Sequence, residues 1–548
     1  MAAELHINSK EITNSSSRTI FELASQSSIN IPTSCTKLGK CKECIIEVKQ
    51  GHELLSEPTS FESHLTDNFR LACQCHIKAK EGIVKCNTLQ RGSLKIETGA
   101  SKKSFLNHLN SLNPAITRIE HDVFLEGKKI ATVENSKNIY GLAIDLGTTT
   151  IVVRLIDLET GQLIITRSFE NPQRFGGSDV MSRIQYETDN KGKILQRVLL
   201  KYLAAEIEKL PASGNQIFEI IIAGNSTMRD MFFGINVYSI GQMPYRSLTE
   251  NELNEGKRKY TDVETTAKKL DLPIHPKASV YGLPLISGHV GADTAACLLA
   301  IDIFNEKNTI VLMDIGTNTE IIIGDKNRLI AASCPAGPAF EGGGIDCGVP
   351  GLDGAIERIS IDSNQKINTQ IIGKTTPIGI CGSGLIDAMA ELLKNDFMNI
   401  YGRFEDPGPF ILNNEHDIYI SEKDINELAQ AKGANIAGFN IALKKYGKPL
   451  EKVKTFYLAG GFGRHINIEN AQQIGFLPSI SKNKTNQIGN ATIEGASIAL
   501  LSISKRKKLR EFVKEIEHVK LESDPNFFDY FVEGCQFKRI SVELENEI

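Results

Sequence analysis

One short sequence pattern occurs twice in this chain of 548 residues. Each copy has an apolar strand that ends in Asp, a polar turn that starts with Gly, and a second strand rich in β-branched residues. The copies read YGLAIDLGTTTIVVRLID (140–157) and TIVLMDIGTNTEIIIGD (309–325). Each predicts a β-hairpin, and two copies at domain-scale separation predict a core made of two similar lobes.

The tips of these hairpins are suited to binding phosphate. A turn of Gly, Thr and Asn exposes backbone N–H groups and side-chain donors that can surround phosphate oxygens. A carboxylate at the end of the first strand can hold a hydrated Mg²⁺ ion or orient an attacking water. We therefore predict Asp145 and Asp314 as catalytic residues. A single tip of this kind would equally be a plain tight turn.

Further landmarks follow in a fixed order along the chain. They are GADTAACLLA (291–300), AGPAFEGGGIDCG (336–348), FYLAGGFGRH (456–465) and IGNATIEGASIAL (488–500). Over residues 140–500 the series resembles the ATPase superfamily of actin, hexokinase and the heat-shock chaperones. The resemblance implies ATP as ligand, phosphates at the hairpins, the nucleoside at the glycine-rich strand break, and two small-residue helices at the hinge. The implied cofactor-binding residues are Gly147, Thr148, Thr149, Gly316, Thr317, Asn318, Gly342, Gly343, Gly460, Gly461 and Gly463.

Six of the eleven cysteines fall within the first 86 residues. Four of them, Cys35, Cys41, Cys44 and Cys73, have the spacing C-x5-C-x2-C-x28-C. A 2Fe–2S cluster needs four thiolates, two for each iron, so these four are the predicted metal ligands. A zinc site is the alternative, but it would need a second close pair of ligands.

The surrounding segments resemble plant-type and adrenodoxin-type ferredoxins over residues 1–90. Strands are expected at Glu4–Ile7, Cys44–Lys49 and Ile83–Cys86, with a short helix starting near Thr19. Cys75 lies two positions after Cys73, so on a strand it would share the same face. It is therefore an alternative fourth ligand.

Composition argues against several classes of function. The net charge is −4, and 41% of residues are hydrophobic, which does not favour nucleic acid or a membrane surface as partner. The Lys505–Arg510 run predicts a solvated helix face. We expect a cytoplasmic protein, because no signal peptide precedes the first strand and no run approaches the ~20 apolar residues of a membrane helix. Three cysteines near the proposed nucleotide cleft, Cys334, Cys347 and Cys381, are predicted to be small buried residues.

The predicted fold class is multidomain, α/β and α+β. An N-terminal β-grasp ferredoxin (1–90) is followed by a polar linker and the start of a small middle domain (91–139), with a hairpin turning at Glu126–Gly127. A two-lobed, actin-like (ribonuclease H-like) core follows, with the first lobe and the middle domain in 140–290 and the second lobe in 291–505. Residues 506–548 form a C-terminal extension without a motif.

The whole layout resembles the reductive activators of corrinoid proteins. The phrases that carry this resemblance are DLGTTT, AGNSTM, GADTAA, DIGTNTE, GICGSGLID and LAGGFGRH. It implies an ATP-dependent transfer of an electron from a 2Fe–2S cluster to a corrinoid protein, reducing Co(II) to Co(I) in anaerobic methyl transfer. It also implies a low-potential electron donor, not identified by the sequence, and a homodimer.

Three other interpretations remain open. An activator of a radical dehydratase or reductase would share the ATPase fold, but in that family a 4Fe–4S cluster is shared across a dimer and there is no ferredoxin module. A non-catalytic redox sensor would bind nucleotide without hydrolysing it. A sugar kinase would leave the cysteine cluster without a role.

Overall fold

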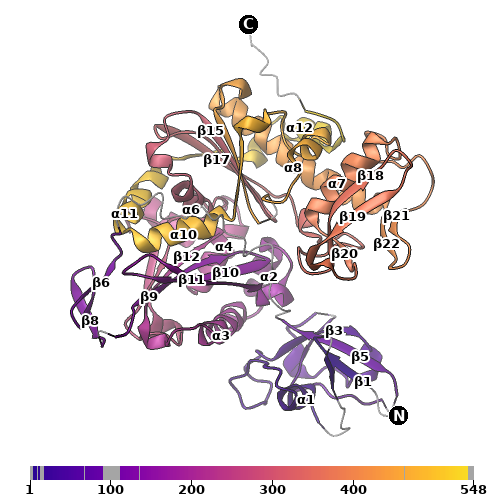
Figure 1. The fold of residues 1–548 in the computed structure, drawn as a ribbon. Coiled ribbons are helices and arrows are strands. Elements are labelled where there is room, and N and C mark those ends of the chain that lie inside the picture. Colours follow the sequence, from indigo (N-terminus) through magenta and orange to yellow (C-terminus); the bar gives the residue numbers. More distant parts are fainter. Residues whose placement is uncertain are drawn as a thin grey trace.

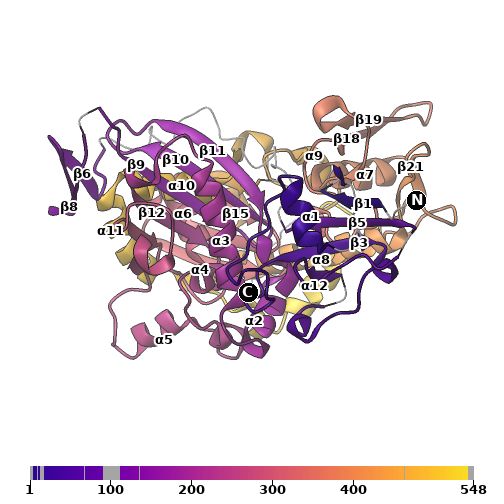
Figure 2. The same ribbon diagram turned by 90° about the horizontal axis from the view of Figure 1, so that it is seen from below.

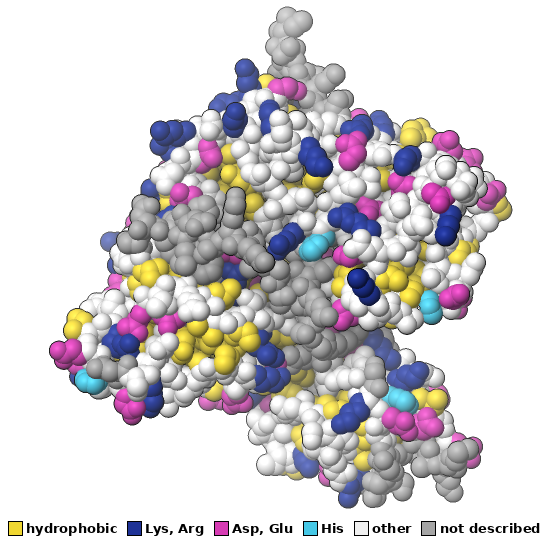
Figure 3. Space-filling view, viewed as in Figure 1, with side chains coloured by type: hydrophobic (Ala, Val, Ile, Leu, Met, Phe, Trp, Pro, Cys, Tyr) yellow, Lys and Arg dark blue, Asp and Glu magenta, His cyan; other side chains and the backbone are white. Residues whose placement is uncertain are grey.

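The computed structural model describes residues 4–8, 10–12, 18–66, 68–79, 81–89, 112–134, 136–461 and 463–540. The polar linker predicted at the start of 91–139 lies outside the described residues. The chain forms three bodies: an N-terminal module at the foot of Figure 1 and two larger lobes above it. In Figure 3, acidic and basic side chains are interspersed over the visible face, and neither sign dominates it.

The N-terminal module is a five-stranded sheet in the order β2-β1-β5-β3-β4, with one helix against it. Its elements are β1 (Glu4–Ile7), β2 (Lys10–Ile12), α1 (Ile20–Gln26), β3 (Ile45–Gln50), β4 (Phe69–Leu71) and β5 (Ile83–Thr88). Helix α1 starts where the sequence predicts, because Thr19 and Glu22 form a reciprocal capping box. This module confirms the predicted ferredoxin fold.

Each predicted hairpin lies at the centre of a six-stranded sheet. The first sheet has the order β11-β10-β9-β12-β14-β13, and the second β24-β23-β15-β16-β17-β25. The strands of the first are β9 (Tyr140–Leu146), β10 (Thr150–Asp157), β11 (Leu163–Glu170), β12 (Ile217–Gly224), β13 (Val263–Thr266) and β14 (Ser279–Gly282). Those of the second are β15 (Ile310–Ile315), β16 (Thr319–Asp325), β17 (Arg328–Cys334), β23 (Thr455–Ala459), β24 (Thr485–Gly489) and β25 (Glu517–His518). When the last strand of each sheet is left out and the second order is read in reverse, the two strand orders are equivalent. This repeat confirms the two-lobed core.

Two helices of small residues pack between the sheets. These are α6 (Ala292–Ala300) and α10 (Ala491–Leu501), and their buried side chains join both sheets in one hydrophobic core. Their backbones approach so closely that a Cβ on Gly495 would lie 1.8 Å from the carbonyl oxygen of Ala296. The small-residue composition of both helices therefore follows from their position at the hinge.

The remaining helices cover the outer faces of the lobes. The first lobe carries α2 (Val180–Asp189), α3 (Ile194–Glu208), α4 (Ser226–Phe232) and α5 (Leu248–Asn254). The second carries α7 (Gly382–Lys394), α8 (Glu422–Tyr446), α9 (Ile468–Gln473) and α12 (Phe527–Cys535), whereas α11 (Ile503–Phe512) contacts α6, α10 and the first lobe. The smaller strands of the second lobe are β18 (Ala355–Ile361), β19 (Ile367–Ile371), β20 (Gly379–Ile380), β21 (Phe410–Asn413) and β22 (Ile418–Ile420).

A small three-stranded sheet precedes the first lobe. It contains β6 (Ile116–Ile119), β7 (Asp122–Leu125) and β8 (Lys128–Thr132), and the turn between β7 and β8 is the predicted Glu126–Gly127. In Figure 2 it lies at the opposite end of the molecule from β21. None of the helices among the described residues is both long and apolar enough to cross a membrane.

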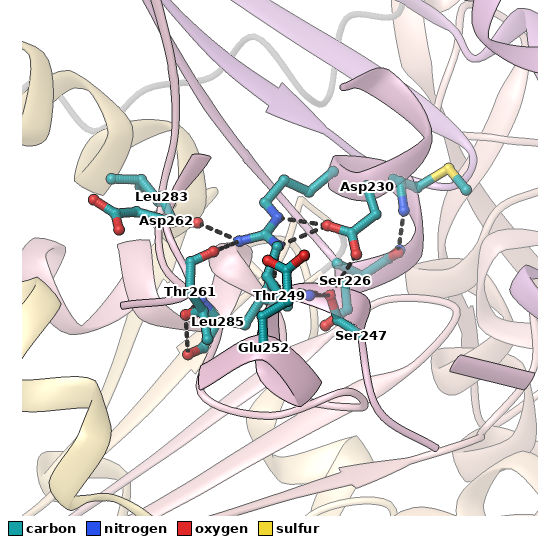
Figure 4. A network of polar contacts seen from close by, with 12 residues as sticks. Ser226, Asp230, Ser247, Thr249, Glu252, Thr261, Asp262, Leu283 and Leu285 are labelled. Carbon is teal, nitrogen blue, oxygen red and sulfur yellow. Dashed lines mark hydrogen bonds and ion pairs between the residues drawn. The ribbon is translucent and has the colours of Figure 1, made fainter. Parts of the chain in front are cut away.

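Two buried ion pairs hold the first lobe together. Arg229 on α4 is fully buried beside Asp230, with 2.6 Å between guanidinium nitrogen and carboxylate oxygen, and it also donates to the carbonyls of Thr261 and Leu283 (Figure 4). Arg506 on α11 pairs with buried Glu219 on β12 at 2.8 Å. The prediction of a fully solvated face for 505–510 is therefore wrong at Arg506, because that side chain compensates a carboxylate inside an apolar strand.

Candidate functional site: a thiol cluster and a nucleotide cleft

The cysteine loop folds back on itself before β3. Thr36, Lys37, Gly39 and Lys42 all have positive φ angles, between 52° and 74°, a conformation in which non-glycine residues are uncommon. This tight wrap brings separate thiols together within one loop. The loop therefore resembles a preformed cradle more than an extended linker.

The four predicted ligands lie as two interacting pairs. The Cys35 thiol interacts with that of Cys41, and the Cys44 thiol interacts with that of Cys73. The hydrogen bond from Cys44 lowers the pKa of Cys73 to about 6. Cys44 and Cys73 are buried, whereas Cys35 and Cys41 are partly exposed.

This arrangement suits a cluster with two irons. Four thiolates in two pairs match the two ligands that each iron of a 2Fe–2S cluster takes. Two separate thiol pairs are therefore compatible with a diiron centre.

Cys75 is not placed as the sequence predicts. Strand β4 ends at Leu71, and residues 72–74 form a turn, so Cys73 and Cys75 do not share a strand face. Burial raises the pKa of Cys75 to about 12, and its charged neighbours are Arg70 and Glu62. Cys75 therefore faces a different part of the module from the four paired thiols.

The second site is a cleft between the two lobes. Both hairpin tips open into it. Its lining is Asp145, Gly147, Thr148, Thr149, Thr150, Asn225, Asp293, Asp314, Ile315, Gly316, Thr317, Asn318, Glu320, Glu341, Gly460, Gly461, Asn490 and Thr492.

Each predicted catalytic carboxylate is held by a hinge helix. The side-chain amide of Asn490, the N-cap of α10, donates to Asp145 Oδ2 at 2.7 Å. Asp314 Oδ2 accepts from the Cys297 thiol at 3.3 Å and from the Thr492 hydroxyl at 3.5 Å. Movement of the hinge helices would therefore move the positions of both carboxylates.

Glu341 connects the two hairpin tips. Its Oε2 accepts from the Thr317 hydroxyl at 2.6 Å and from the Thr149 hydroxyl at 3.2 Å. Burial raises the pKa of this carboxyl group. The two hydroxyls most suited to phosphate oxygens are thus turned toward a carboxylate that belongs to neither hairpin.

The cleft also contains a set of buried acids. Burial raises the pKa of Asp293 to about 7, and it raises the pKa of Asp314 and of Glu320 as well. Carboxylate oxygens are among the ligands that Mg²⁺ takes in proteins.

A more apolar cavity adjoins the phosphate cleft and shares Thr149 and Gly461 with it. Phe340, Val349 and the N-terminal end of α7 contribute to its lining, together with Cys381, Ser383 and His465. Its position beside the hairpin tips is suited to a nucleoside.

The predicted glycines divide into two groups. Gly460 lines the cleft with a φ of 93°, and a Cβ there would lie 2.3 Å from the carbonyl oxygen of Ile315. Gly342, Gly343 and Gly463 are outside both linings; an added Cβ at each would instead meet neighbouring protein atoms. Of the three outlying cysteines, Cys334 and Cys381 are buried as predicted, but Cys347 is only partly buried.

Seven polar residues of the cleft were not predicted as site residues from the sequence. They are Thr150, Asn225, Asp293, Glu320, Glu341, Asn490 and Thr492. Each lies within or beside a conspicuous motif, and Asn225 and Asn490 are helix N-caps. A polar residue between a strand and a helix is the signal that identifies the two caps.

Comparison with known proteins gives three consecutive family matches. The 2Fe-2S iron-sulfur cluster binding domain matches residues 5–78, the RACo middle region matches 140–306, and the C-terminal domain of RACo, the ASKHA domain, matches 308–547. Together they cover both candidate sites.

Curated relatives span nearly the whole chain. The corrinoid activation enzyme RamQ of Eubacterium limosum is 29% identical over 578 aligned positions, covering 93% of this chain and 95% of the relative. A [Co(II) methylated amine-specific corrinoid protein] reductase of Methanosarcina barkeri is 25% identical, covering 74% of this chain and 78% of the relative.

A solved structure titled reductive activator for corrinoid, iron-sulfur protein matches with a TM-score of 0.72 and 26% identity, covering all of both chains. Its full coverage includes the thiol module as well as the two lobes. The chain therefore belongs to the RACo family of reductive activators, in which a 2Fe–2S domain precedes a middle region and an ASKHA domain.

Proposed function

We propose that this protein is an ATP-dependent reductive activator of a corrinoid protein. It transfers one electron from its 2Fe–2S cluster to the corrinoid and reduces Co(II) to Co(I). One observation carries the proposal: a single chain combines a four-thiol iron–sulfur site with a two-lobed nucleotide cleft. The relatives named for corrinoid activation and corrinoid reduction support it.

The residues have separable roles in this proposal. Cys35, Cys41, Cys44 and Cys73 hold the cluster, which supplies one-electron chemistry when bound. The hairpin tips bind the phosphates through their N–H groups and hydroxyls. Asp145 and Asp314 position the attacking water and a hydrated Mg²⁺. The glycine-rich break at Gly460 and Gly461 receives the nucleoside.

ATP hydrolysis is needed because transfer of an electron from the cluster to an acceptor of lower reduction potential is unfavourable. Plant-type clusters have potentials near ~−400 mV, and an acceptor 100 mV lower costs ~2.3 kcal/mol for each electron. Nucleotide states can supply such an amount only if they differ in their affinity for a conformation or partner. The hinge helices, which hold Asp145 and Asp314, are suited to produce that difference.

Three further features belong to the proposal. The active form is a homodimer, which light scattering at micromolar concentration would detect. A low-potential protein or small-molecule donor reloads the cluster after each transfer. The functional units follow the predicted divisions at 1–90, 91–139, 140–290, 291–505 and 506–548.

ATP hydrolysis in the presence and absence of a Co(II) corrinoid protein tests the assignment. An activator should hydrolyse ATP faster when its corrinoid partner is present. A redox sensor would bind ATP without such stimulation, and a sugar kinase would be stimulated by a small phosphate acceptor instead. Stimulation by a dehydratase, but not by corrinoid proteins, would favour the dehydratase activator.

A further inference from the structure

The ferredoxin module has a specific contact surface on the first lobe. Arg174 lies in the short 3-10 helix η4 (Pro172–Gly176). Its guanidinium is 2.7 Å from a carboxylate oxygen of Glu47 on β3, and it donates to the carbonyl of Thr88 on β5 at 3.0 Å. Both Arg174 and Glu47 are largely buried, so this contact is sheltered from solvent.

A second arginine reaches the cluster loop itself. Arg197 on α3 donates to the carbonyl of Cys41 at 2.7 Å, and its Nε is 3.5 Å from a carboxylate oxygen of Glu43. Glu43 is buried and also accepts from the Ser34 hydroxyl at 2.6 Å. The ATPase region thus places a guanidinium, paired with Glu43, against the loop segment that carries Cys41 and Cys44.

A cation at this position has a predictable electrostatic effect. Reduction adds one electron and makes the cluster site one charge more negative. A nearby guanidinium stabilises the reduced form more than the oxidised form, which raises the reduction potential. Removing that cation by undocking the module would lower the potential and make the cluster a stronger reductant.

The same surface is connected to the phosphate-binding turn. The side chain of Asn171, the N-cap of η4, donates to the carbonyl of Gly147 at 2.8 Å, and its backbone N–H donates to the carbonyl of Thr149 at 2.7 Å. Buried Arg183 donates to the carbonyl of Thr148 at 2.8 Å. Two carbonyls of the turn are therefore fixed to the segment that carries Arg174, and the carbonyl between them is fixed to the next helix, α2.

We propose that Arg174 and Arg197 form a docking seat for the ferredoxin module, in which Arg197 raises the reduction potential of the cluster. Nucleotide binding at the phosphate-binding turn changes the fraction of molecules in which the module is docked on this seat. Release of the module from the seat lowers the reduction potential of the cluster. This inference rests on the proposed cluster assignment. It explains how a nucleotide could influence electron transfer without contacting the cluster.

Potentiometric titration of the intact, iron-loaded protein, monitored by electron paramagnetic resonance, tests the role of Arg197. We expect Arg197→Gln to have a more negative midpoint potential than the wild type. Lys201→Gln is the matched control, because Lys201 lies on the same helix but pairs with exposed Asp271 of its own lobe. An unchanged potential in Arg197→Gln, or an equal shift in Lys201→Gln, would overturn the proposal.

Small-angle scattering tests the seat separately. The Arg174→Gln, Arg197→Gln double variant should have a larger radius of gyration than the wild type. A non-hydrolysable ATP analogue should change both the radius and the midpoint potential of the wild type relative to ADP. Identical values in both nucleotide states would refute control by nucleotide. No corrinoid protein is present in these measurements, so they remain interpretable if the proposed acceptor is incorrect.

Discussion

The thiol cluster and the nucleotide cleft both suit charged inorganic groups, but they draw on very different lengths of chain. Three of the four thiols come from the single loop Cys35–Cys44, and one returns from a nearby turn. The cleft takes its lining from segments spread between Asp145 and Thr492. The first site therefore depends on local backbone geometry, and the second depends on how two lobes pack at a hinge.

This contrast predicts that the thiol cluster and the nucleotide cleft can be disrupted separately. The module and the lobes form separate sheets, so local damage to the thiol loop should leave the cleft intact. The module also packs against the first lobe, so the tests below measure how far damage to the lobes reaches the thiols. Function, in contrast, needs both sites together.

Loss of one cluster ligand should have the largest effect. Cys41→Ala removes one of four thiolates, and we expect loss of the 2Fe–2S absorption and of all electron transfer. ATP binding, measured by calorimetry, should match the wild type. A variant that retained the full visible spectrum would contradict the ligand assignment.

Substitution of a cleft carboxylate should produce the reverse pattern. Asp145→Ala or Asp314→Ala should lower the rate of ATP hydrolysis by about 100-fold or more, as loss of a preorganised transition-state contact does in other enzymes. The cluster spectrum should remain, while ATP-dependent Co(I) formation is lost. Unchanged Co(I) formation in both variants would refute the phosphate-site assignment.

Disruption of the buried Arg229–Asp230 pair in the first lobe should destabilise the lobes but not the ferredoxin module. Arg229→Met leaves Asp230 as a buried charge without its partner, which costs about 3–5 kcal/mol. Calorimetry should show that the lobes unfold at a lower temperature than in the wild type. The visible circular dichroism of the cluster should disappear at the same temperature as in the wild type.

Arg258→Met is the control for that experiment. Arg258 makes a more exposed ion pair with Glu252 in the same region, and such pairs contribute about 0–1 kcal/mol. If Arg229→Met shifted the cluster transition as much as the lobe transition, the two regions would not be independent.

The smallest expected effect concerns a residue that supports a carboxylate. Asn490→Ala removes the amide that orients Asp145, and we expect about a tenfold slower hydrolysis, in the range seen when outer-shell partners are lost. Steady-state ATPase assays give the rate. A rate equal to the wild type would mean that Asp145 keeps its position without the hinge helix.

The strands of both regions could be predicted because their signals are local. Alternating or continuous apolar runs ending at Asp145 and Asp314 define the hairpins, and the capping box at Thr19 defines α1. Spacing of the cysteines likewise indicates the cluster loop, since three thiols in one short loop need little help from the rest of the fold.

The remaining features depend on packing that spacing does not reveal. Glu341 reaches both hairpins only because the segment that carries it folds back over the cleft. Cys75 leaves the expected face because a turn interrupts the strand after Leu71. Arg506 is buried because Glu219, far away in the sequence, needs a partner inside an apolar strand.

The most direct test of the account combines both sites in one reaction. The reduced, iron-loaded protein is mixed anaerobically with a Co(II) corrinoid protein, with and without ATP, and the Co(I) absorption is followed. We predict that ATP accelerates Co(I) formation in the wild type but not in Asp314→Ala. Equal rates with and without ATP in the wild type would contradict the claim that the cleft drives electron transfer from the cluster.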